Sequence, residues 1–346
     1  MEITDAENVI HSLSKIQNSS SRRSSAHKSL LKYAPIIVLI VVPAFITEAY
    51  IVHVLFLCCF FAFLSEAFNL VSYTGSLSLG HAAFLGLGAY ASTYLFLSHG
   101  ISPLVGIFAG GLLAAAAGLI ISYPCFRFGL RGPFFALTTI AFAEVLSYVF
   151  VNLDAVGGAY GLLITFSKYG PSAKDLLFEN KLAYYYIMLA MMLGLIYSVS
   201  RLEKSKFGFY VNAIREDEDA AWSLGINVTK IQVTSATISA FLTGLGGTFY
   251  AFYFLYIEPL GIFTIDRSVE IATPAIIGGQ ATVLGPILGA FILTPVAEFL
   301  RAYFGGGFIG IHLIVYGAVI VVGAMLLPEG LIVGLERLLK RFSKAS

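Results

Sequence analysis

Charged residues are scarce in this sequence, and the scarcity excludes an ordinary water-soluble domain. Asp, Glu, Lys and Arg together make up 12% of the 346 residues, whereas hydrophobic residues make up 58%. Soluble globular domains carry about 25% charged residues, so a soluble core of this length could not bury so much apolar surface. A bilayer accepts such a chain, because each spanning helix needs about 20 apolar residues. The composition therefore predicts an all-α, polytopic helix bundle in a membrane.

Signatures of covalent chemistry are also missing. The sequence contains no GxxxxGK[ST] phosphate loop, no HExxH pair, no GxSxG elbow and no cluster of Cys and His. The stretch 86–91 fits GxGxxA, but it lies inside an apolar run with no preceding strand, so we interpret its glycines as packing residues. We therefore expect no catalytic residue, no metal site and no cofactor on this chain.

Cysteine is rare, and its placement excludes a disulfide framework. The three cysteines are Cys58, Cys59 and Cys125, all within or beside apolar runs. Neighbours on one helix point in different directions and cannot readily bridge. We interpret all three as small apolar side chains in the packing.

Apolar stretches follow one another along most of the chain. They lie at about 34–48, 50–71, 77–98, 102–122, 134–152, 182–200, 231–256, 267–279, 283–301 and 308–327. Each is long enough to span a bilayer or nearly so, except 267–279. We predict about ten transmembrane helices within a membrane region at 33–335, preceded by a polar, Ser-rich tail at 1–32 and followed by a basic tail at 336–346.

Lys and Arg indicate which loops face the cytoplasm. Arg127 and Arg131 mark one basic loop, and a second extends over 201–230. Starting inside, four crossings return the chain inside at the first loop and six return it at the second. A cytoplasmic basic tail then requires an even total, so 267–279 must count as a short crossing and not as a re-entrant hairpin. We predict that both termini are cytoplasmic.

Two polar interruptions of apolar runs are candidates for a solute path. The first covers Gly75–His81 and includes Ser76 and Ser78, and the second covers Gly278–Thr282 and includes Gly279. Transporters often contain internal repeats with broken helices in matching places, and unwound backbone at membrane depth survives only where protein or water satisfies it. We expect a pair of such breaks. A metal-binding role for His81 has little support, since no second ligand lies nearby in the sequence.

Polar side chains inside predicted spans form a second candidate set. Glu144 lies near the middle of 134–152 and either lines the path or hydrogen-bonds a neighbouring helix, and the sequence leaves both open. Thr138 and Thr139 either line the path or bond back to their own helix carbonyls. The same alternatives hold for four further residues, Glu66, Asn69, Glu298 and His312. For His53, near a span start, an interfacial position is favoured.

The basic loop at 201–229 contains an acidic run. Glu216, Asp217, Glu218 and Asp219 precede Ala220 and Ala221, and Gly225 follows. Acids favour the first turn of a helix, and glycine favours the position just after its end, so we predict a short helix at about 216–224. Its two alanines would leave a shallow face for a partner's groove. The alternative is an ordinary solvated charge run.

This loop also carries a resemblance. The residues 219–225, Asp-Ala-Ala-Trp-Ser-Leu-Gly, resemble the EAA-x-x-x-G loop of ABC importer permeases, with Asp in place of Glu. The wider stretch 207–226 is similar to branched-chain amino acid permeases of the LivM type, as are 76–84, 130–139 and 327–331. Two positions depart from that family: Tyr160 stands where its Gly-Gly-x-Asp-Gly-Leu segment has an acid, and Gln280 where an apolar residue or Gly is usual.

The resemblance implies a permease subunit of the bacterial inner membrane that moves branched-chain amino acids or related small polar solutes inward. Its partners would be a homologous second permease, two cytosolic ATPases that bind ATP-Mg, and an extracytoplasmic solute-binding protein, with no nucleic acid involved. The residues expected to couple to the ATPases are Arg215, Glu216, Asp217, Glu218, Asp219, Ala220, Ala221 and Gly225.

Two alternatives remain open at this stage. An ion-coupled secondary transporter would use Glu144 or His81 for the coupling ion and would need no ATPase. An ABC permease for urea or short amides would keep the same architecture. The sequence does not identify the solute.

Overall fold

A computed structural model describes residues 37–41, 43–45, 48–165, 170, 172 and 174–304, and beyond these 314, 317–318, 321, 325, 330–332 and 334. The predicted tails at 1–32 and 336–346, His312 and most of 327–331 lie outside the described residues. The chain divides into two compact units, Met1–Val52 and His53–Ser346. Every contact discussed below lies within the second unit.

The predicted apolar stretches from 50 to 301 coincide with helices. These helices are α2 (Ala49–Ser72), α3 (His81–His99), α4 (Pro103–Arg127), α5 (Pro133–Val151), α7 (Lys181–Glu203), α10 (Val228–Phe254), α12 (Ile265–Gly279) and α13 (Gly285–Phe304). Among the described residues, five of them are long and apolar enough to cross a bilayer by length and composition, namely α2, α4, α5, α7 and α13. The membrane bundle is therefore confirmed.

The number of crossings remains a prediction. Helix α12 has 15 residues, a length of about 22 Å at 1.5 Å per residue, against about 30 Å for the hydrocarbon layer. The stretches 34–48 and 308–327 are described only in part. A total of ten therefore rests on the charge pattern of the loops.

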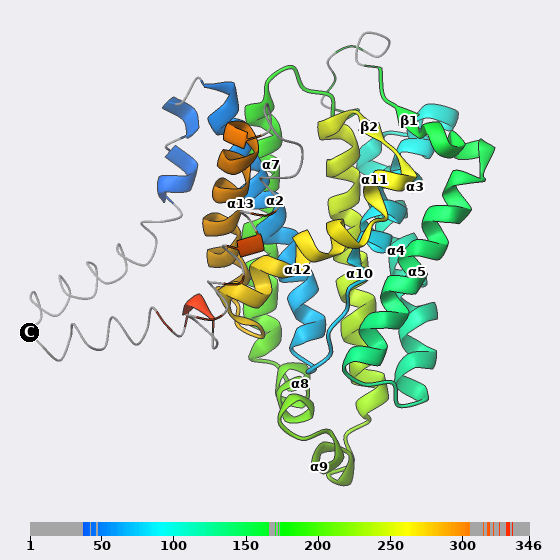
Figure 1. Cartoon of the computed structure of the whole chain (residues 1–346), viewed down its shortest axis with the longest axis vertical. Coiled ribbons are helices and arrows are strands. Elements are labelled where there is room, and N and C mark those ends of the chain that lie inside the picture. The colour runs from blue at the N-terminus through cyan, green and yellow to red at the C-terminus, as the bar shows by residue number, and fades with distance from the viewer. Residues whose placement is uncertain are drawn as a thin grey trace, which may run out of the picture. The chain divides into compact units, whose positions relative to one another are not determined.

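Glycine contacts determine how closely α3, α4 and α10 pack, and these three helices lie together in Figure 1. A Cβ at Gly110 of α4 would overlap the Gly88 backbone of α3, and one at Gly88 would overlap the Gly244 backbone of α10. Gly106 lies against Ser92 in the same α3–α4 contact. Backbones therefore approach closely at Gly106 and Gly110, and Gly88 of the GxGxxA stretch is a packing residue, as predicted.

The loops fall on the two ends of the bundle as their charges predict. At one end Arg131, in the loop after α4, forms an ion pair with Glu218, in the loop after α7. At the other end β1 (Leu162–Leu163) pairs antiparallel with β2 (Tyr256–Ile257). These two short strands are the exception to the all-α expectation within the part of the chain that the structure describes. The loops after α4 and α7 therefore lie at one end of the bundle, and the loops after α5 and α10 lie at the other end, as predicted.

Both predicted breaks are present. The helix α2 ends at Ser72 and α3 begins at His81, and α12 ends at Gly279 and α13 begins at Gly285. At the second break Gly279 has a φ of +127°, which favours glycine. The internal repeat suggested by the two breaks remains a prediction.

Candidate functional site

The acidic loop forms two consecutive short helices, α8 (Lys206–Glu216) and α9 (Glu218–Ser223), which lie together at the lower end of Figure 1. Asp217 is the N-cap of α9, and its carboxylate accepts hydrogen bonds from the backbone N–H groups of Asp219 (3.0 Å) and Ala220 (2.9 Å). This capping satisfies two of the donors that every helix start leaves free. The predicted short helix is confirmed.

The end of α9 is fixed by Gly225. Its φ of +84° is the left-handed conformation that favours glycine. The Ile226 N–H donates to the Ala221 carbonyl (3.1 Å) and the Gly225 N–H to the Trp222 carbonyl (2.9 Å). These two bonds form a Schellman motif, which closes the helix and turns the chain toward α10.

The exposed surface of α9 differs from the expectation for its two alanines. Ala220 is exposed, but Ala221 is 2% exposed and packs against Ile214 and Val228. A six-residue helix has room for one inward position, and Ala221 occupies it because α8 and α10 flank the loop. The protruding side chains are Trp222, 73% exposed, and Leu224, 80% exposed. Sequence reasoning did not single out either of them.

Arg131 connects α9 to the loop between α4 and α5. Its Nε lies 3.0 Å from Glu218 Oε2, and its Nη2 lies 3.3 Å from Asp219 Oδ1. One guanidinium therefore holds two neighbouring carboxylates with its fork of donors. The predicted coupling residues Glu218 and Asp219 are thereby tied to the chain just before α5.

Arg215, at the end of α8, lies beside the first break. A Cβ at Gly75 would meet the Arg215 Cα at 3.8 Å, which is ordinary van der Waals contact. Glu216 and Asp217 are exposed next to it. The end of α8 therefore lies against the turn that follows α2.

The first break is buried and held by side chains from three other helices. The Leu79 N–H donates to Thr139 Oγ1 of α5 (3.0 Å), and the Ala82 N–H donates to Ser268 Oγ of α12 (3.0 Å). His81 Nε2 lies 2.8 Å from Ser239 Oγ of α10. Ser76 and Ser78 are buried in the same segment. One backbone N–H of the break and one in the first turn of α3 thus bond to side chains of other helices, as expected at membrane depth.

The space beside the first break is small. A cavity beside Ser78, Ser122 and Thr139 measures about 10 Å³, roughly enough for one water molecule. The predicted path residues Ser76, Ser78, His81 and Thr139 are all buried, and their role in a solute path stays a prediction.

The second break is held by α2. Asn69 Oδ1 accepts from the Ala281 N–H (2.7 Å) and Asn69 Nδ2 donates to the Thr282 carbonyl (2.9 Å). Gly278 is buried where α12 and α13 meet, and a Cβ there would overlap the Gly285 carbonyl. Both Gly278 and Gly279 therefore serve the close turn between these helices.

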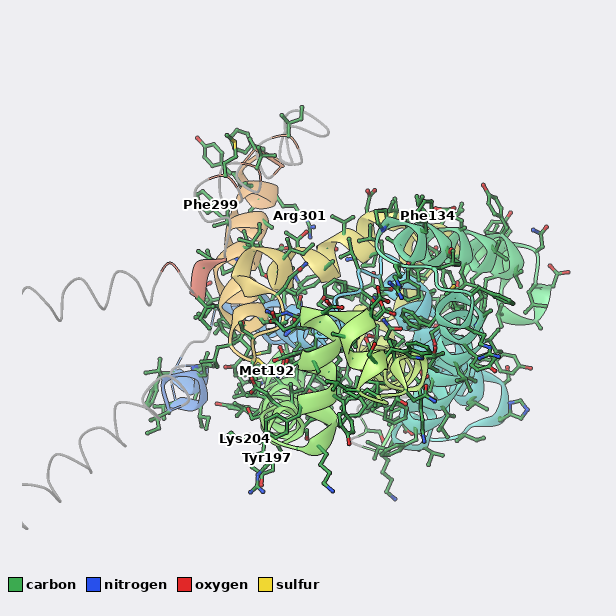
Figure 2. The ribbon with its side chains drawn as sticks, turned by 90° about the horizontal axis from the view of Figure 1, so that it is seen from below. Phe134, Met192, Tyr197, Lys204, Phe299 and Arg301 are labelled. Atoms are coloured by element: carbon green, nitrogen blue, oxygen red, sulfur yellow. The ribbon has the colours of Figure 1, made fainter. Side chains whose placement is uncertain are left out.

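Thr138 and Glu144 both lie on α5. Thr138 is half-buried and donates to the Phe134 carbonyl of its own helix (2.9 Å), which is one of the two alternatives predicted for it. Glu144 is exposed on α5, on a face with Leu137 and Tyr148, which are 61% and 65% exposed. Figure 2 shows Phe134, at the start of this helix, projecting on the side opposite Tyr197 and Lys204.

Three further polar residues of the predicted set have polar partners. Glu298 forms an ion pair with Arg301 at 2.7 Å, and His53 Nδ1 lies 2.6 Å from the Tyr253 hydroxyl. Glu66 is buried beside Asn69, with Nδ2 to Oε2 at 3.4 Å. All three cysteines are buried and free, as predicted.

A charged cluster on α12 escaped the sequence reasoning. Arg267 Nη1 lies 2.5 Å from Glu270 Oε2, and the guanidinium also lies over the Tyr250 ring, with its hydroxyl 3.3 Å from Nη2. The i, i+3 spacing of Arg and Glu in a predicted span was the available signal. No group of three or more metal-ligating side chains occurs among the described residues.

Known proteins with similar sequences place this architecture in a family. Residues 50–324 match the family described as branched-chain amino acid transport system / permease component. The chain belongs to this family. It is therefore a multi-pass membrane permease component, and the match covers the acidic loop at 216–225 and both breaks.

Individual relatives agree with the family. The chain is 28% identical over 289 residues to the high-affinity branched-chain amino acid transport system permease protein LivM of Salmonella typhimurium, covering 76% of this chain and 65% of that protein. It is 27% identical to LivM of Escherichia coli, covering 89% and 76%. A probable LivH permease of Methanocaldococcus jannaschii is 25% identical, covering 68% and 74%. No solved structure gave a significant match.

Proposed function

We propose that this permease component is the membrane subunit of an ATP-driven importer that moves branched-chain amino acids or related small polar solutes into the cell. It crosses the bacterial inner membrane about ten times, with both termini in the cytoplasm. ATP is hydrolysed on separate subunits. The family match and the relatives' names support this proposal.

One structural observation carries the proposal: α9 is a capped helix whose tip protrudes from the basic end of the bundle. Asp217 fixes its start and Gly225 its end, while Trp222 and Leu224 stay exposed. An exposed Trp and Leu at a helix end are more apolar than a solvated charge run requires. This shape suits a docking site for a cytosolic ATPase.

Two contacts could carry a displacement of α9 into the bundle. Arg131 ties α9 to the start of α5, and Thr139 of α5 holds the Leu79 N–H of the first break. Arg215 lies against Gly75 at the same break. We propose that ATPase movement repacks this break and so opens the buried segment around Ser78 and His81.

The other partners follow from the same assignment. A homologous second permease completes the path, and Glu144 with its exposed face of α5 is the candidate contact. A solute-binding protein docks at the opposite end, where Tyr160 is 91% exposed between Gly157 and Gly161. The aromatic side chain replaces the acid of the family segment, so this contact is expected to be apolar where an acid would make it ionic.

Cross-linking tests the ATPase dock. The native cysteines are buried, so Leu224→Cys supplies a single reactive thiol at the tip of α9. We expect it to cross-link to the ATPase subunit, while Tyr160→Cys at the opposite end does not. Absence of any cross-link from position 224, with the complex still transporting solute, would overturn the assignment.

Reconstitution separates the transporter classes and the solutes. Vesicles holding this chain with its partners should take up solute on addition of ATP and not on an ion gradient alone. Gradient-driven uptake by this chain alone would instead favour the secondary transporter with Glu144 or His81 as the coupling group. Competition by leucine, urea and acetamide against uptake identifies the solute class.

A further inference from the structure

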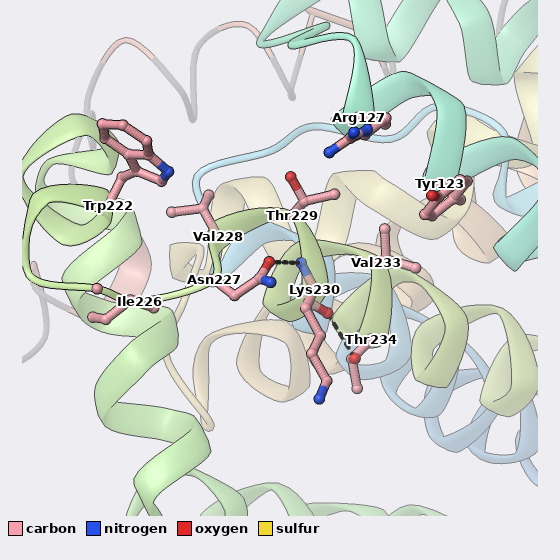
Figure 3. Close-up of a pocket in the computed structure, with 11 residues that line it drawn as sticks. Tyr123, Arg127, Trp222, Ile226, Asn227, Val228, Thr229, Lys230, Val233 and Thr234 are labelled. Atoms are coloured by element: carbon pink, nitrogen blue, oxygen red, sulfur yellow. Dashed lines mark hydrogen bonds between the residues drawn. The ribbon is translucent and has the colours of Figure 1, made fainter.

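A groove opens at the basic end of the bundle, between the last turn of α4 and the first turns of α10. Its volume is about 600 Å³, and its lining includes Tyr123, Arg127, Trp222, Thr229 and Lys230. Figure 3 shows the Arg127 guanidinium and the Thr229 hydroxyl pointing toward each other, with the Trp222 indole on the far side of the groove. Hydrogen-bond donors thus surround an open space.

The charge of the groove has one sign. Its lining contains Arg127 and Lys230 but no Asp or Glu, and neither cation forms an ion pair among the residues that the structure describes. The acids nearest in sequence, Glu218 and Asp219, are engaged by Arg131. The groove therefore favours an anion with oxygen acceptors.

An exposed apolar stripe on α4 leads into the groove. Leu112 and Ile120 are 64% and 69% exposed, Tyr123 follows at 56%, and Arg127 comes one turn later. Aliphatic side chains come first along this stripe, then an aromatic ring, then a cation. Membrane proteins show the same order from the hydrocarbon layer to the headgroups of a bilayer. The stripe indicates that the molecule bound in the groove has an apolar tail as well as an anionic group.

We propose that this groove binds the phosphate headgroup of an anionic phospholipid. Arg127 and the Trp222 and Thr229 donors contact the phosphate, Lys230 adds positive charge from the rim, and an acyl chain lies along Leu112 and Ile120. Basic pockets between helices at a membrane surface are suited to such headgroups. Because Trp222 of α9 and Gly225, just after the end of α9, both line the groove, the bound lipid would hold this helix against the bundle.

The chain contains one tryptophan, Trp222, so its fluorescence reports on this groove directly. The full chain in mixed micelles is titrated with phosphatidylglycerol brominated near the top of one acyl chain, and separately with the equivalent phosphatidylcholine. We expect saturable quenching by phosphatidylglycerol at least tenfold tighter than by phosphatidylcholine. The variant Arg127→Gln/Lys230→Gln should lose this preference, and the matched variant Lys204→Gln/Lys206→Gln should keep it.

Several results would overturn the proposal. Equal quenching by the two lipids would mean that Trp222 is merely near a bilayer, and an unchanged Arg127→Gln/Lys230→Gln variant would mean that the groove is not the site. Competition by inorganic phosphate alone at similar concentration would indicate a free anion. Complete loss of quenching when the ATPase subunit is added would indicate that the groove is a protein contact. The lipid and phosphate titrations require neither transport nor the ATPase, so their result is independent of the proposed import activity.

Discussion

Asn69 and Thr282 are hydrogen-bonded across 213 positions of sequence, at 2.9 Å from Nδ2 to the carbonyl oxygen. The other end of the same carboxamide accepts from the Ala281 N–H. Asn69 thus hydrogen-bonds one backbone donor and one backbone acceptor of the turn between α12 and α13. Backbone groups at this depth have little water available, so a side chain from α2 satisfies them.

The first prediction concerns this bridge. Asn69→Leu removes both hydrogen bonds and leaves a half-buried N–H and a half-buried carbonyl unpaired, at a cost of about 1–3 kcal/mol. We expect a clear fall in the midpoint of thermal unfolding, followed with a thiol-reactive dye because the three cysteines are buried. Asn152→Leu is the matched control, since the Asn152 side chain is exposed and bonds locally to Tyr148. Equal midpoints for the two variants would contradict the bridging role.

The helices could be predicted from apolar run length, and α9 from its capping residues, because both depend on neighbours in the sequence. The side chains that hold the two breaks could not be predicted in this way. Asn69, Ser239 and Ser268 meet the unwound segments only after distant helices pack. The orientation of Ala221 was missed for the same reason: Ile214 and Val228 bury it from two flanking helices.

The second prediction concerns Arg131. Arg131→Glu replaces its ion pairs with Glu218 and Asp219 by repulsion, and we expect ATP-driven uptake to fall at least fivefold. Stability should change by less than about 1 kcal/mol, because Arg131 and Asp219 are exposed and Glu218 is only half-buried. Combining it with Glu218→Arg should restore uptake, whereas Lys204→Glu at the same end should have little effect. A charge-reversed pair as poor as the single variant would rule out a coupling role for this contact.

The third prediction separates capping from charge at Asp217. Asp217→Ala removes the acceptor for two N–H groups and should destabilise α9 by about 1 kcal/mol. Asp217→Asn keeps the cap and loses the charge. We expect uptake to drop with Ala and to stay near normal with Asn, at equal membrane insertion. Equal losses in both variants would show that the carboxylate charge, and not the helix start, is what the ATPase requires.

The fourth prediction concerns Glu144, a carboxylate on an exposed apolar helix face. Such a group is costly against lipid, by about 2.5–3.5 kcal/mol on insertion scales for charged residues, so we expect this face to meet the second permease or a wet path. Glu144→Leu should then insert normally but reduce uptake at least tenfold. Tyr148→Phe, one turn along the same face, is the control. Normal uptake by Glu144→Leu would place the face in lipid.

The fifth prediction tests whether glycine contacts hold α3, α4 and α10 together. In Gly88→Ala the new Cβ would overlap the Gly244 backbone, and two helix backbones would have to separate to admit it. Backbone atoms cannot give way as the end of a flexible side chain can, so overpacking costs typically 1–3 kcal/mol or more. Gly194→Ala is the matched control, because nothing lies within 4 Å of a Cβ there and alanine favours the helix by about 1 kcal/mol. The dye-monitored midpoint should therefore fall for Gly88→Ala and hold or rise for Gly194→Ala. If both variants behave alike, the close approach of α3 and α10 does not determine the stability of the bundle.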